Sequence, residues 1–252
     1  MKLKDKVGIV TAAAGAGIGQ AIAKKFAQEG AYVVLTDYHE KRTMKIADAM
    51  KSEYGEDRII GIKCDVSNRV EVENMAKQAL DKFGRIDILV NNAGREILNP
   101  VEKVTDEEWN IVVGVNLKGM FYCAKAVIPS MIKQKYGRLI NISSIAAWVG
   151  SPMGECSYAA AKAGMIGFAK SLAREMGPYN ITVNSITPGV IPNPFLEKIY
   201  PPGALDKIAK RAALGRGGKP EEVANVAAFL ASEEASYVTG ETIIISGGRY
   251  VR

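Results

Sequence analysis

The alternation of short apolar runs with longer amphipathic stretches most constrains the fold of this chain. The apolar runs are rich in Val and Ile, and they lie at 7–11, 32–36, 59–63, 86–90, 138–143, 181–187 and 242–246. Helical patterns separate them, at 17–29, 40–54, 69–83, 106–134, 156–177 and 220–232. Because the runs are apolar throughout rather than at every second residue, both faces of each strand should be covered. We predict an α/β fold with a doubly wound, mainly parallel seven-stranded sheet and helices on both faces.

Length and charge set the domain count and the partners. The 252 residues, 48% of them hydrophobic, suffice for one domain over 1–252, and no linker or low-complexity segment divides them. The net charge of +6 comes from Lys and Arg scattered among Asp and Glu, without a basic stripe. We therefore expect no nucleic-acid partner and only a mild attraction to anions such as phosphates or CoA esters.

The N-terminal segment and the cysteines point to a compartment. MKLKDKVGIVTAAAG lacks the apolar stretch and cleavage site of a signal peptide, and no run of about 18 apolar residues is evident. Cys64, Cys123 and Cys156 are far apart, and His39 is the only histidine. We expect a cytoplasmic protein with reduced thiols, no membrane association and no metal.

A glycine-rich turn follows the first expected strand, in TAAAGAGIGQAIAKKF at 11–26. Gly15, Gly17 and Gly19 precede a helix whose first N–H groups are free to bind a phosphate. Together with Ile18 they suit the pyrophosphate of a dinucleotide, although a tight structural turn has the same composition.

Asp37 stands at the end of the second expected strand, about 20 residues after the glycine turn. An acid there accepts hydrogen bonds from an adenosine ribose and repels a 2′-phosphate, which favours NAD over NADP. Lys41 and Arg42 follow closely and leave NADP open. A helix N-cap is the structural alternative for Asp37.

Small and polar residues end the next two strands. Asp65 and Val66 follow the third strand, where Asp65 is positioned to reach an adenine amino group. Asn92, Ala93 and Gly94 follow the fourth strand and suit packing beside a cofactor. Turn chemistry explains both groups equally.

Tyr158 and Lys162 lie four residues apart in an alanine-rich run, so both project from one helix face. A neighbouring cation favours the phenolate, which brings a tyrosine towards general acid or base work near neutral pH. Ser144 is placed to hold a substrate oxygen. Asn116 interrupts an apolar helical pattern, and a buried amide needs partners. Taken alone, the Tyr158/Lys162 pair also fits a solvated helix surface, and Asn116 a structural amide.

In this order the motifs resemble the short-chain dehydrogenase/reductase family, in its single-domain form of about 250 residues. The resemblance covers essentially the full chain. It implies a Rossmann-type fold and the nicotinamide-dependent interconversion of an alcohol and a ketone. The matching residues are the glycine turn, Asp37, CDV at 64–66, NNAG at 91–94, Asn116, NISS at 141–144, YAAAK at 158–162, Pro188-Gly189 and ISGG at 245–248.

The resemblance implies a role for each matching residue. Tyr158 is the general acid/base, and Ser144 binds the reacting oxygen. Lys162 holds the nicotinamide ribose and lowers the Tyr158 pKa, while Asn116 organises a water that links Lys162 to solvent. Further cofactor contacts are implied for Pro188, Gly189, Ile191 and Asn193.

The glycine turn departs from the family pattern. Ala12 replaces its first glycine, and one extra residue intervenes before Gly17. We read a reshaped phosphate loop, in which Gly15 is expected to supply a positive φ.

Three further departures lie nearer the substrate. The loop SPMGECS at 151–157 is one residue longer than the common pattern. Asn193 stands where a threonine is common, and it retains an amide that can bind a carboxamide. The tail at 249–252 has no assignment.

Residues 193–218 mix apolar side chains, prolines and glycines, and they predict a mobile substrate lid with a short helix. The alternative is that this segment is an ordinary surface loop. An apolar pocket suits a cyclic alcohol, a steroid-like substrate or a hydroxyacyl thioester, and the sequence does not choose among them. Candidate pocket walls are Trp148, Met153, Phe195 and Tyr200, although core packing explains Trp148 equally well.

The leading hypothesis is an NAD-linked oxidoreductase acting on a small-molecule secondary alcohol or its ketone. The alternative is an NADPH-dependent 3-oxoacyl reductase acting on acyl carrier protein or CoA esters, which Asp37 disfavours. A non-catalytic nucleotide-binding scaffold is a third hypothesis. The resemblance also implies a homotetramer, assembled through the helices at 106–134 and 156–177 and the C-terminal segment.

Overall fold

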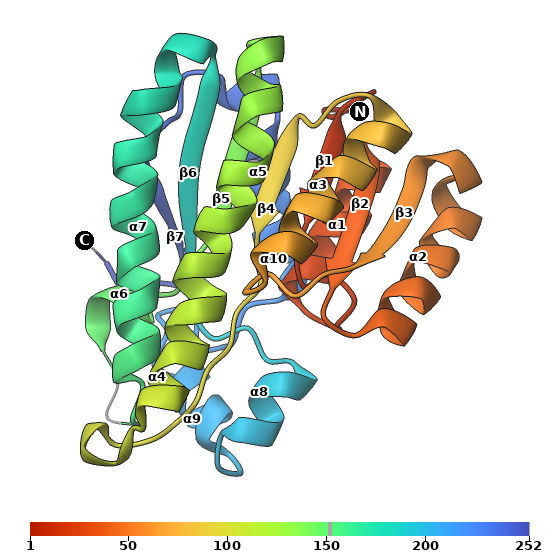
Figure 1. Ribbon diagram of the computed structural model, residues 1–252. Helices are drawn as coiled ribbons and strands as arrows, with labels where there is room; N and C mark the ends of the chain where they lie inside the picture. The colour runs from red at the N-terminus through yellow and green to blue at the C-terminus, as the bar shows by residue number, and fades with distance from the viewer. Residues whose placement is uncertain (151–152, 252) are drawn as a thin grey trace.

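Seven strands form one sheet in the order β3-β2-β1-β4-β5-β6-β7, and all six neighbouring pairs are parallel (Figure 1). The computed structural model describes residues 1–150 and 153–251. The predicted α/β, Rossmann-type sheet is confirmed, and it is parallel throughout. The strands are β1 (Val7–Val10), β2 (Tyr32–Asp37), β3 (Ile59–Lys63), β4 (Ile88–Asn91), β5 (Gly137–Ile142), β6 (Ile181–Pro188) and β7 (Thr242–Ile245).

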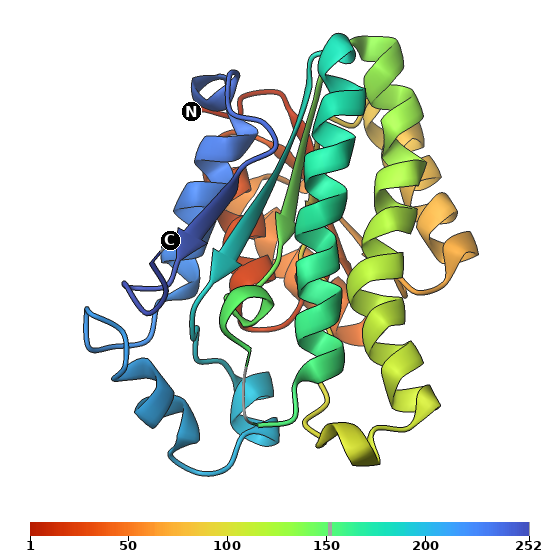
Figure 2. The ribbon, with the colours of Figure 1, turned by 90° about the vertical axis from the view of Figure 1, so that its left-hand side faces the viewer.

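Helices cover both faces of the sheet, so that the molecule has three layers (Figure 2). One face carries α3, α5 and α7, and the other carries α1, α2 and α10. The helices are α1 (Ile18–Gln28), α2 (Glu40–Tyr54), α3 (Arg69–Phe83), α4 (Asp106–Val113), α5 (Gly119–Gln134), α6 (Ala146–Val149), α7 (Cys156–Met176), α8 (Pro194–Ile199), α9 (Ala204–Ala209) and α10 (Pro220–Ala231).

Capping side chains explain where two of these helices begin. Asn68 accepts the backbone N–H groups of Val70 and Glu71 at the start of α3. Thr105 and Glu108 form a reciprocal capping box at the start of α4. Each cap satisfies amide donors that the first helical turn leaves free, which fixes the loops that connect the helices to the sheet.

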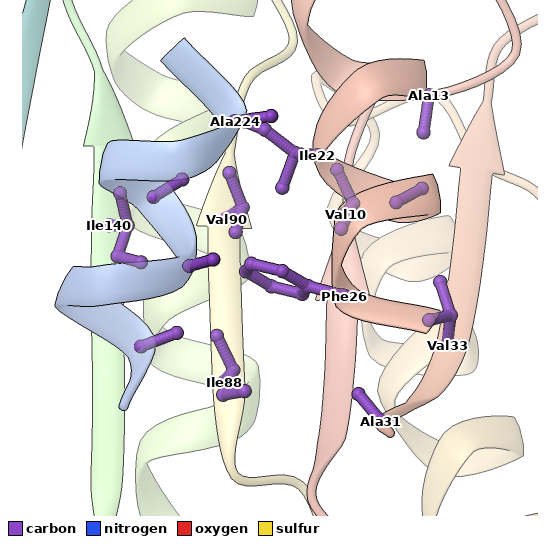
Figure 3. Close-up of a cluster of buried hydrophobic side chains, with 14 of the residues drawn as sticks. Val10, Ala13, Ile22, Phe26, Ala31, Val33, Ile88, Val90, Ile140 and Ala224 are labelled. Carbon is purple, nitrogen blue, oxygen red and sulfur yellow. The ribbon is translucent and has the colours of Figure 1, made fainter. Parts of the chain in front are cut away.

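Phe26 projects from α1 into the core towards α10, beside Ile88 and Val90 of β4 (Figure 3). Its side chain is fully buried, and an added Cβ at Gly8 would lie only 3.0 Å from the ring. A glycine in β1 therefore makes room for the largest apolar side chain of α1. This contact seats α1, and with it the glycine turn, against the sheet.

The predicted helix at 106–134 contains a wider turn. A π-helical segment, η3 (Gly114–Lys118), joins α4 to α5 and carries Asn116. By length and composition alone, Asp106–Gln134 could cross a membrane, a possibility that the sequence analysis did not recognise. Its apolar residues Cys123, Val127 and Met131 are buried in the core, as in the core helix of a globular fold.

The predicted lid contains two short helices, α8 and α9, rather than one. Figures 1 and 2 show both beyond the carboxyl ends of the strands. Asn193 caps α8 by accepting the N–H groups of Phe195 and Leu196. The four-residue helix α6 was not predicted from the sequence.

Candidate active site

The carboxyl ends of the strands surround a cleft of about 1400 Å³. A pocket for one small ligand is usually about 300–1000 Å³, so this cleft has room for a dinucleotide and a substrate together. It opens where the strand order reverses between β1 and β4, which is the expected ligand position in such sheets. Predicted site residues that line it are Gly15, Gly17, Ile18, Gly19, Asp37, Asp65, Val66, Asn92, Ala93, Gly94, Ser144, Tyr158, Lys162, Pro188, Gly189, Ile191, Asn193, Phe195 and Tyr200.

The glycine turn is held by residues from the end of β4. The Thr11 hydroxyl accepts the backbone N–H groups of Asn92 and Ala93, both at 2.9 Å. The Asn92 amide in turn donates to the carbonyls of Thr11 and Ala12, at 3.0 and 3.2 Å. Ala12 adopts φ 50°, so the positive φ expected at Gly15 lies at Ala12 instead. These hydrogen bonds offset the strain of about 1–2 kcal/mol that a left-handed alanine carries.

Gly19 is required by its close neighbours. An added Cβ would lie 2.5 Å from the Ala12 carbonyl oxygen and would also contact the Asn92 amide. The absence of a side chain thus lets α1 begin directly against the turn. Among the described residues, no side chain caps the first N–H groups of α1. An uncapped helix start beside a wide cleft fits the pyrophosphate of a dinucleotide.

Asp37 is buried at the end of β2 and accepts three hydrogen bonds. The donors are the backbone N–H groups of Ala14 and His39 and the guanidinium of Arg42, at 3.2, 3.1 and 3.0 Å. An ionised carboxylate has about four acceptor positions, so one remains for a ribose hydroxyl. Asp65 lies nearby in the same cleft, where it accepts the backbone N–H and hydroxyl of Ser67.

Ser144, Tyr158 and Lys162 meet at the floor of the cleft. The Lys162 Nζ donates to the Ile142 carbonyl at 2.8 Å and lies 5.5 Å from the centre of the Tyr158 ring. The Ser144 hydroxyl accepts the N–H of Ala146 and hydrogen-bonds the Tyr158 side chain. The helical spacing and the end of β5 therefore bring a phenol, a hydroxyl and an ammonium together.

Burial changes the acid–base properties of this group. It raises the pKa of Tyr158, and the negative charge of Glu96 raises it further, whereas the Ser144 hydrogen bond opposes the rise. Burial also lowers the pKa of Lys162 to about 8, against the attraction of Glu96. The sequence predicted that Lys162 lowers the Tyr158 pKa, but here burial has the larger effect. Tyr158 is therefore a neutral phenol, the form that donates a proton.

Asn116 is buried beside this group but does not line the cleft. Its amide donates to the carbonyls of Arg95 and Val112, at 2.7 and 2.8 Å. Its Oδ1 has no partner among the described residues. An added Cβ at Gly94 would lie 3.0 Å from that oxygen and 3.6 Å from the Lys162 Nζ. An unpaired acceptor close to an ammonium suits a bridging water, so the predicted relay stays a prediction.

The predicted pocket walls divide into two sets. Phe195 and Tyr200 line the cleft, whereas Trp148 and Met153 do not. The Trp148 ring instead stacks on Tyr250, with ring centres 5.9 Å apart and planes 7° from parallel. The C-terminal tail thus occupies the indole face that was expected to meet substrate.

Two further segments bear on the pocket. Ser151 and Pro152, which begin the lengthened loop SPMGECS, lie outside the described residues. Asn193 lines the cleft, but its Oδ1 caps α8 and its amide donates to the Ile191 carbonyl. One of its two N–H groups remains for the expected carboxamide contact.

Two acidic residues of the cleft were not predicted from the sequence. Glu96 follows NNAG directly, and Glu155 precedes Tyr158 by three residues. Both are buried and both line the cleft. Their position next to recognised motifs was the only signal in the sequence. Over residues 1–150 and 153–251, no group of three or more His, Cys, Asp or Glu side chains is arranged to hold a metal.

We predict that Gly19→Ala weakens dinucleotide binding at least about tenfold and lowers the midpoint of thermal unfolding, because the new Cβ must displace the Ala12 backbone. NADH fluorescence titration and calorimetry measure the two effects. Gly15→Ala is the matched variant, since a Cβ at Gly15 meets nothing within 4 Å. Its unfolding midpoint should stay unchanged. Equal stability of the two variants would contradict the steric argument.

Comparisons with known proteins agree with this geometry. A family model described as Enoyl-(Acyl carrier protein) reductase matches residues 12–249. The 3-oxoacyl acyl-carrier-protein reductase FabG of Thermotoga maritima is 42% identical over 250 residues, covering 98% of this chain and 99% of that protein. FabG of Escherichia coli is 40% identical over 251 residues, covering 100% of both. BbsD, a hydroxy(phenyl)methylsuccinyl-CoA dehydrogenase subunit of Thauera aromatica, is 37% identical over 249 residues, or 99% of this chain and 98% of that protein.

The full-length matches and the arrangement of the cleft lead to one assignment. The sheet order, the glycine turn and the grouping of Ser144, Tyr158 and Lys162 are those that the sequence motifs implied. The chain belongs to the short-chain dehydrogenase/reductase family and is an NAD(P)-dependent oxidoreductase.

Proposed function

We propose that the protein interconverts a 3-oxoacyl thioester and the corresponding 3-hydroxyacyl thioester, using NAD(H). The main support for the chemistry is the grouping of Ser144, Tyr158 and Lys162 in a cleft large enough for cofactor and substrate. A 3-hydroxyacyl group is a secondary alcohol. The proposal therefore keeps the NAD-linked alcohol chemistry of the leading hypothesis and takes its acyl thioester substrate from the alternative hypothesis.

The relatives support a thioester. Their names specify an oxoacyl group on acyl carrier protein or a hydroxylated acyl group on CoA. The cleft lining of this chain is balanced in charge, so the support for a thioester comes from the relatives. Five cationic side chains line it, Arg42, Arg95, Lys162, Lys198 and Arg249, beside five acidic ones, Asp37, Asp65, Glu96, Glu107 and Glu155.

The chemistry follows from the side chains at the cleft floor. When bound, a nicotinamide dinucleotide supplies or accepts the hydride. In the reductive direction negative charge develops on the ketone oxygen, and the neutral phenol of Tyr158 gives that oxygen a proton. The Ser144 hydroxyl donates a second hydrogen bond to the same atom. Lys162 binds the nicotinamide ribose, and a water at Asn116 returns a proton towards Lys162.

The surroundings of Asp37 favour NAD(H) over NADP(H). A 2′-phosphate at the adenosine ribose would meet the buried Asp37 carboxylate, and repulsion between two anions in such a place is costly. Arg42 is the cation closest at hand, but its guanidinium is already paired with Asp37 at 3.0 Å. The alternative is an NADPH-dependent reductase, which requires the Arg42 guanidinium to break its ion pair with Asp37.

We also propose a homotetramer in the cytoplasm. The large apolar residues Trp109 of α4 and Phe121 of α5 are 43% and 41% exposed. Phe121 packs edge-on against Phe168 of α7, with ring centres 6.4 Å apart. An exposed apolar surface across α4, α5 and α7 suits burial against another copy.

We predict that Tyr158→Phe lowers kcat by about 10²- to 10⁴-fold, because the substrate oxygen loses its proton donor. NADH affinity, measured by fluorescence, should change less than about threefold. Because the pKa of Tyr158 is raised, alcohol oxidation by the wild type should increase as pH rises, whereas ketone reduction should be favoured at lower pH. Tyr237→Phe, at a fully exposed tyrosine, is the control. Substantial turnover by Tyr158→Phe would overturn the assigned role.

A substrate panel tests the proposed substrate class. We expect acetoacetyl-CoA to give a higher kcat/KM with NADH than cyclohexanone, a 3-oxosteroid or a ketose. Steady-state assays at one pH, with all four compounds and both reduced cofactors, make the comparison. A preference for a cyclic ketone would refute the thioester assignment while leaving the dehydrogenase chemistry in place.

Cofactor choice is tested by Asp37→Asn. Removing the carboxylate charge should free Arg42 and lower the dissociation constant of NADPH, relative to that of NADH, at least about tenfold. Asp48→Asn, on the exposed face of α2, is the matched control and should leave the ratio of the two constants unchanged. A wild-type enzyme that binds NADPH more tightly than NADH would establish the alternative.

The assembly is tested by light scattering on the purified protein. Four copies should give four times the 27.1 kDa chain mass. Phe121→Asp places a charge in the exposed apolar surface and should reduce the mass. A wild type that is monomeric at micromolar concentration would contradict the tetramer.

A further inference from the structure

Tyr200 joins the lid to two buried carboxyl groups. It follows α8, and its hydroxyl oxygen lies 2.8 Å from Glu96 Oε1 and 2.8 Å from Glu155 Oε1. Glu96 belongs to the segment after β4, and Glu155 immediately precedes α7. Residues 104 and 45 positions away from Tyr200 in the sequence therefore meet at one oxygen atom.

Counting hydrogens shows that this arrangement needs an extra proton. A phenol has a single hydrogen, so Tyr200 can donate to one carboxylate only. The other carboxyl, also at hydrogen-bond distance, must then donate to the phenol oxygen and be protonated. If both glutamates were ionised, one contact would have no hydrogen, and two buried anions would face each other across the phenol. Glu96 and Glu155 thus share one proton when Tyr200 is in place.

The lid has little apolar anchoring at this end. α8 contributes no buried residue, and its Phe195 is 38% exposed. The packing of α8 alone therefore gives little apolar stabilisation. The Tyr200 hydroxyl gives this part of the lid a polar contact to two buried groups.

The surroundings of Glu96 favour its protonated form. Burial, and next the charge of Glu155, raise the pKa of Glu96 to about 7, whereas the Tyr200 hydrogen bond and Lys162 oppose the rise. The titratable groups that act on the pair are Tyr158 and Lys162 of α7 and Tyr200 of the lid. Since the pKa is raised, the protonated pair exists at lower pH and is lost as pH rises through about 7.

We propose that Glu96 and Glu155 are positioning residues which, while sharing one proton, hold Tyr200 and so keep the lid closed over the substrate. The proposal rests on the proposed function, because it takes the cleft as the substrate site. Lid closure is then linked to the uptake of one proton at a place separate from the reacting atoms. Substrate affinity should therefore fall as pH rises, because the lid loses this contact.

Two variants that preserve side-chain shape separate this effect from others. Tyr200→Phe removes the hydroxyl and should raise KM for acetoacetyl-CoA about tenfold at pH 6, with a smaller change in kcat. Its KM should no longer respond to pH. Glu155→Gln supplies an amide that donates and accepts at every pH. It should keep KM low from pH 6 to 8.5, whereas KM of the wild type should rise about tenfold over that range.

The measurement is the pH dependence of KM and kcat for the three proteins. The proposal is overturned if Glu155→Gln retains the wild-type pH dependence of KM, or if Tyr200→Phe does. A merely structural role predicts a loss of stability without a change in the pH profile, so unfolding midpoints at pH 6 and 8.5 are recorded alongside.

Hydrogen exchange of the lid tests the same contact without any turnover. Amides of 193–218 in the wild type should be better protected than in Tyr200→Phe at pH 6, and equally protected at pH 8.5. Glu155→Gln should keep the protection at both. If the thioester is not a substrate but this pattern appears, the proposed function fails and the proton-dependent lid contact stands. Equal protection in all three proteins at pH 6 overturns the contact itself.

Discussion

The hydrogen bonds of Thr11 join the ends of β1 and β4, and the rest of the site depends on them. Parallel strands at this point send their connections to opposite faces of the sheet, so the backbone separates and leaves a crevice. The Thr11 hydroxyl and the Asn92 amide close its base with donors and acceptors from both sides. The glycine turn is thereby fixed on one side and Gly94 on the other, where an added Cβ would meet Asn116 and Lys162.

Much of the fold followed from the sequence because its pattern is local. All seven apolar runs became strands, and the helices at 40–54 and 69–83 have the predicted bounds. The π turn around Asn116 was missed, because one extra residue in a helix hardly alters its periodicity. The positive φ was assigned to Gly15 rather than Ala12, since glycine is the usual residue there. The conformation of Ala12 is set by Asn92, which is 80 residues away in the sequence.

The motifs located the site more reliably than its electrostatics. Ser144, Tyr158 and Lys162 meet as the spacing implied, but the direction of the Tyr158 pKa shift depends on burial and on Glu96, which no local pattern reveals. Glu96 and Glu155 read as ordinary loop acids until the fold places them around Tyr200. The sequence left Trp148 open between a pocket wall and core packing, because the ring that stacks on it, Tyr250, lies at the far end of the chain.

The stacking of Tyr250 on Trp148 has a mechanical consequence. One residue earlier, Arg249 donates to the Ile208 carbonyl of α9 at 2.9 Å, so the same short tail contacts both α6 and the lid. The tail therefore links α6 to a helix of the proposed lid. Any outward swing of α9 either breaks the Arg249 contact or peels the aromatic ring from Trp148. In a lid that opens as proposed, Arg249 and Tyr250 thus limit how far the cleft can open.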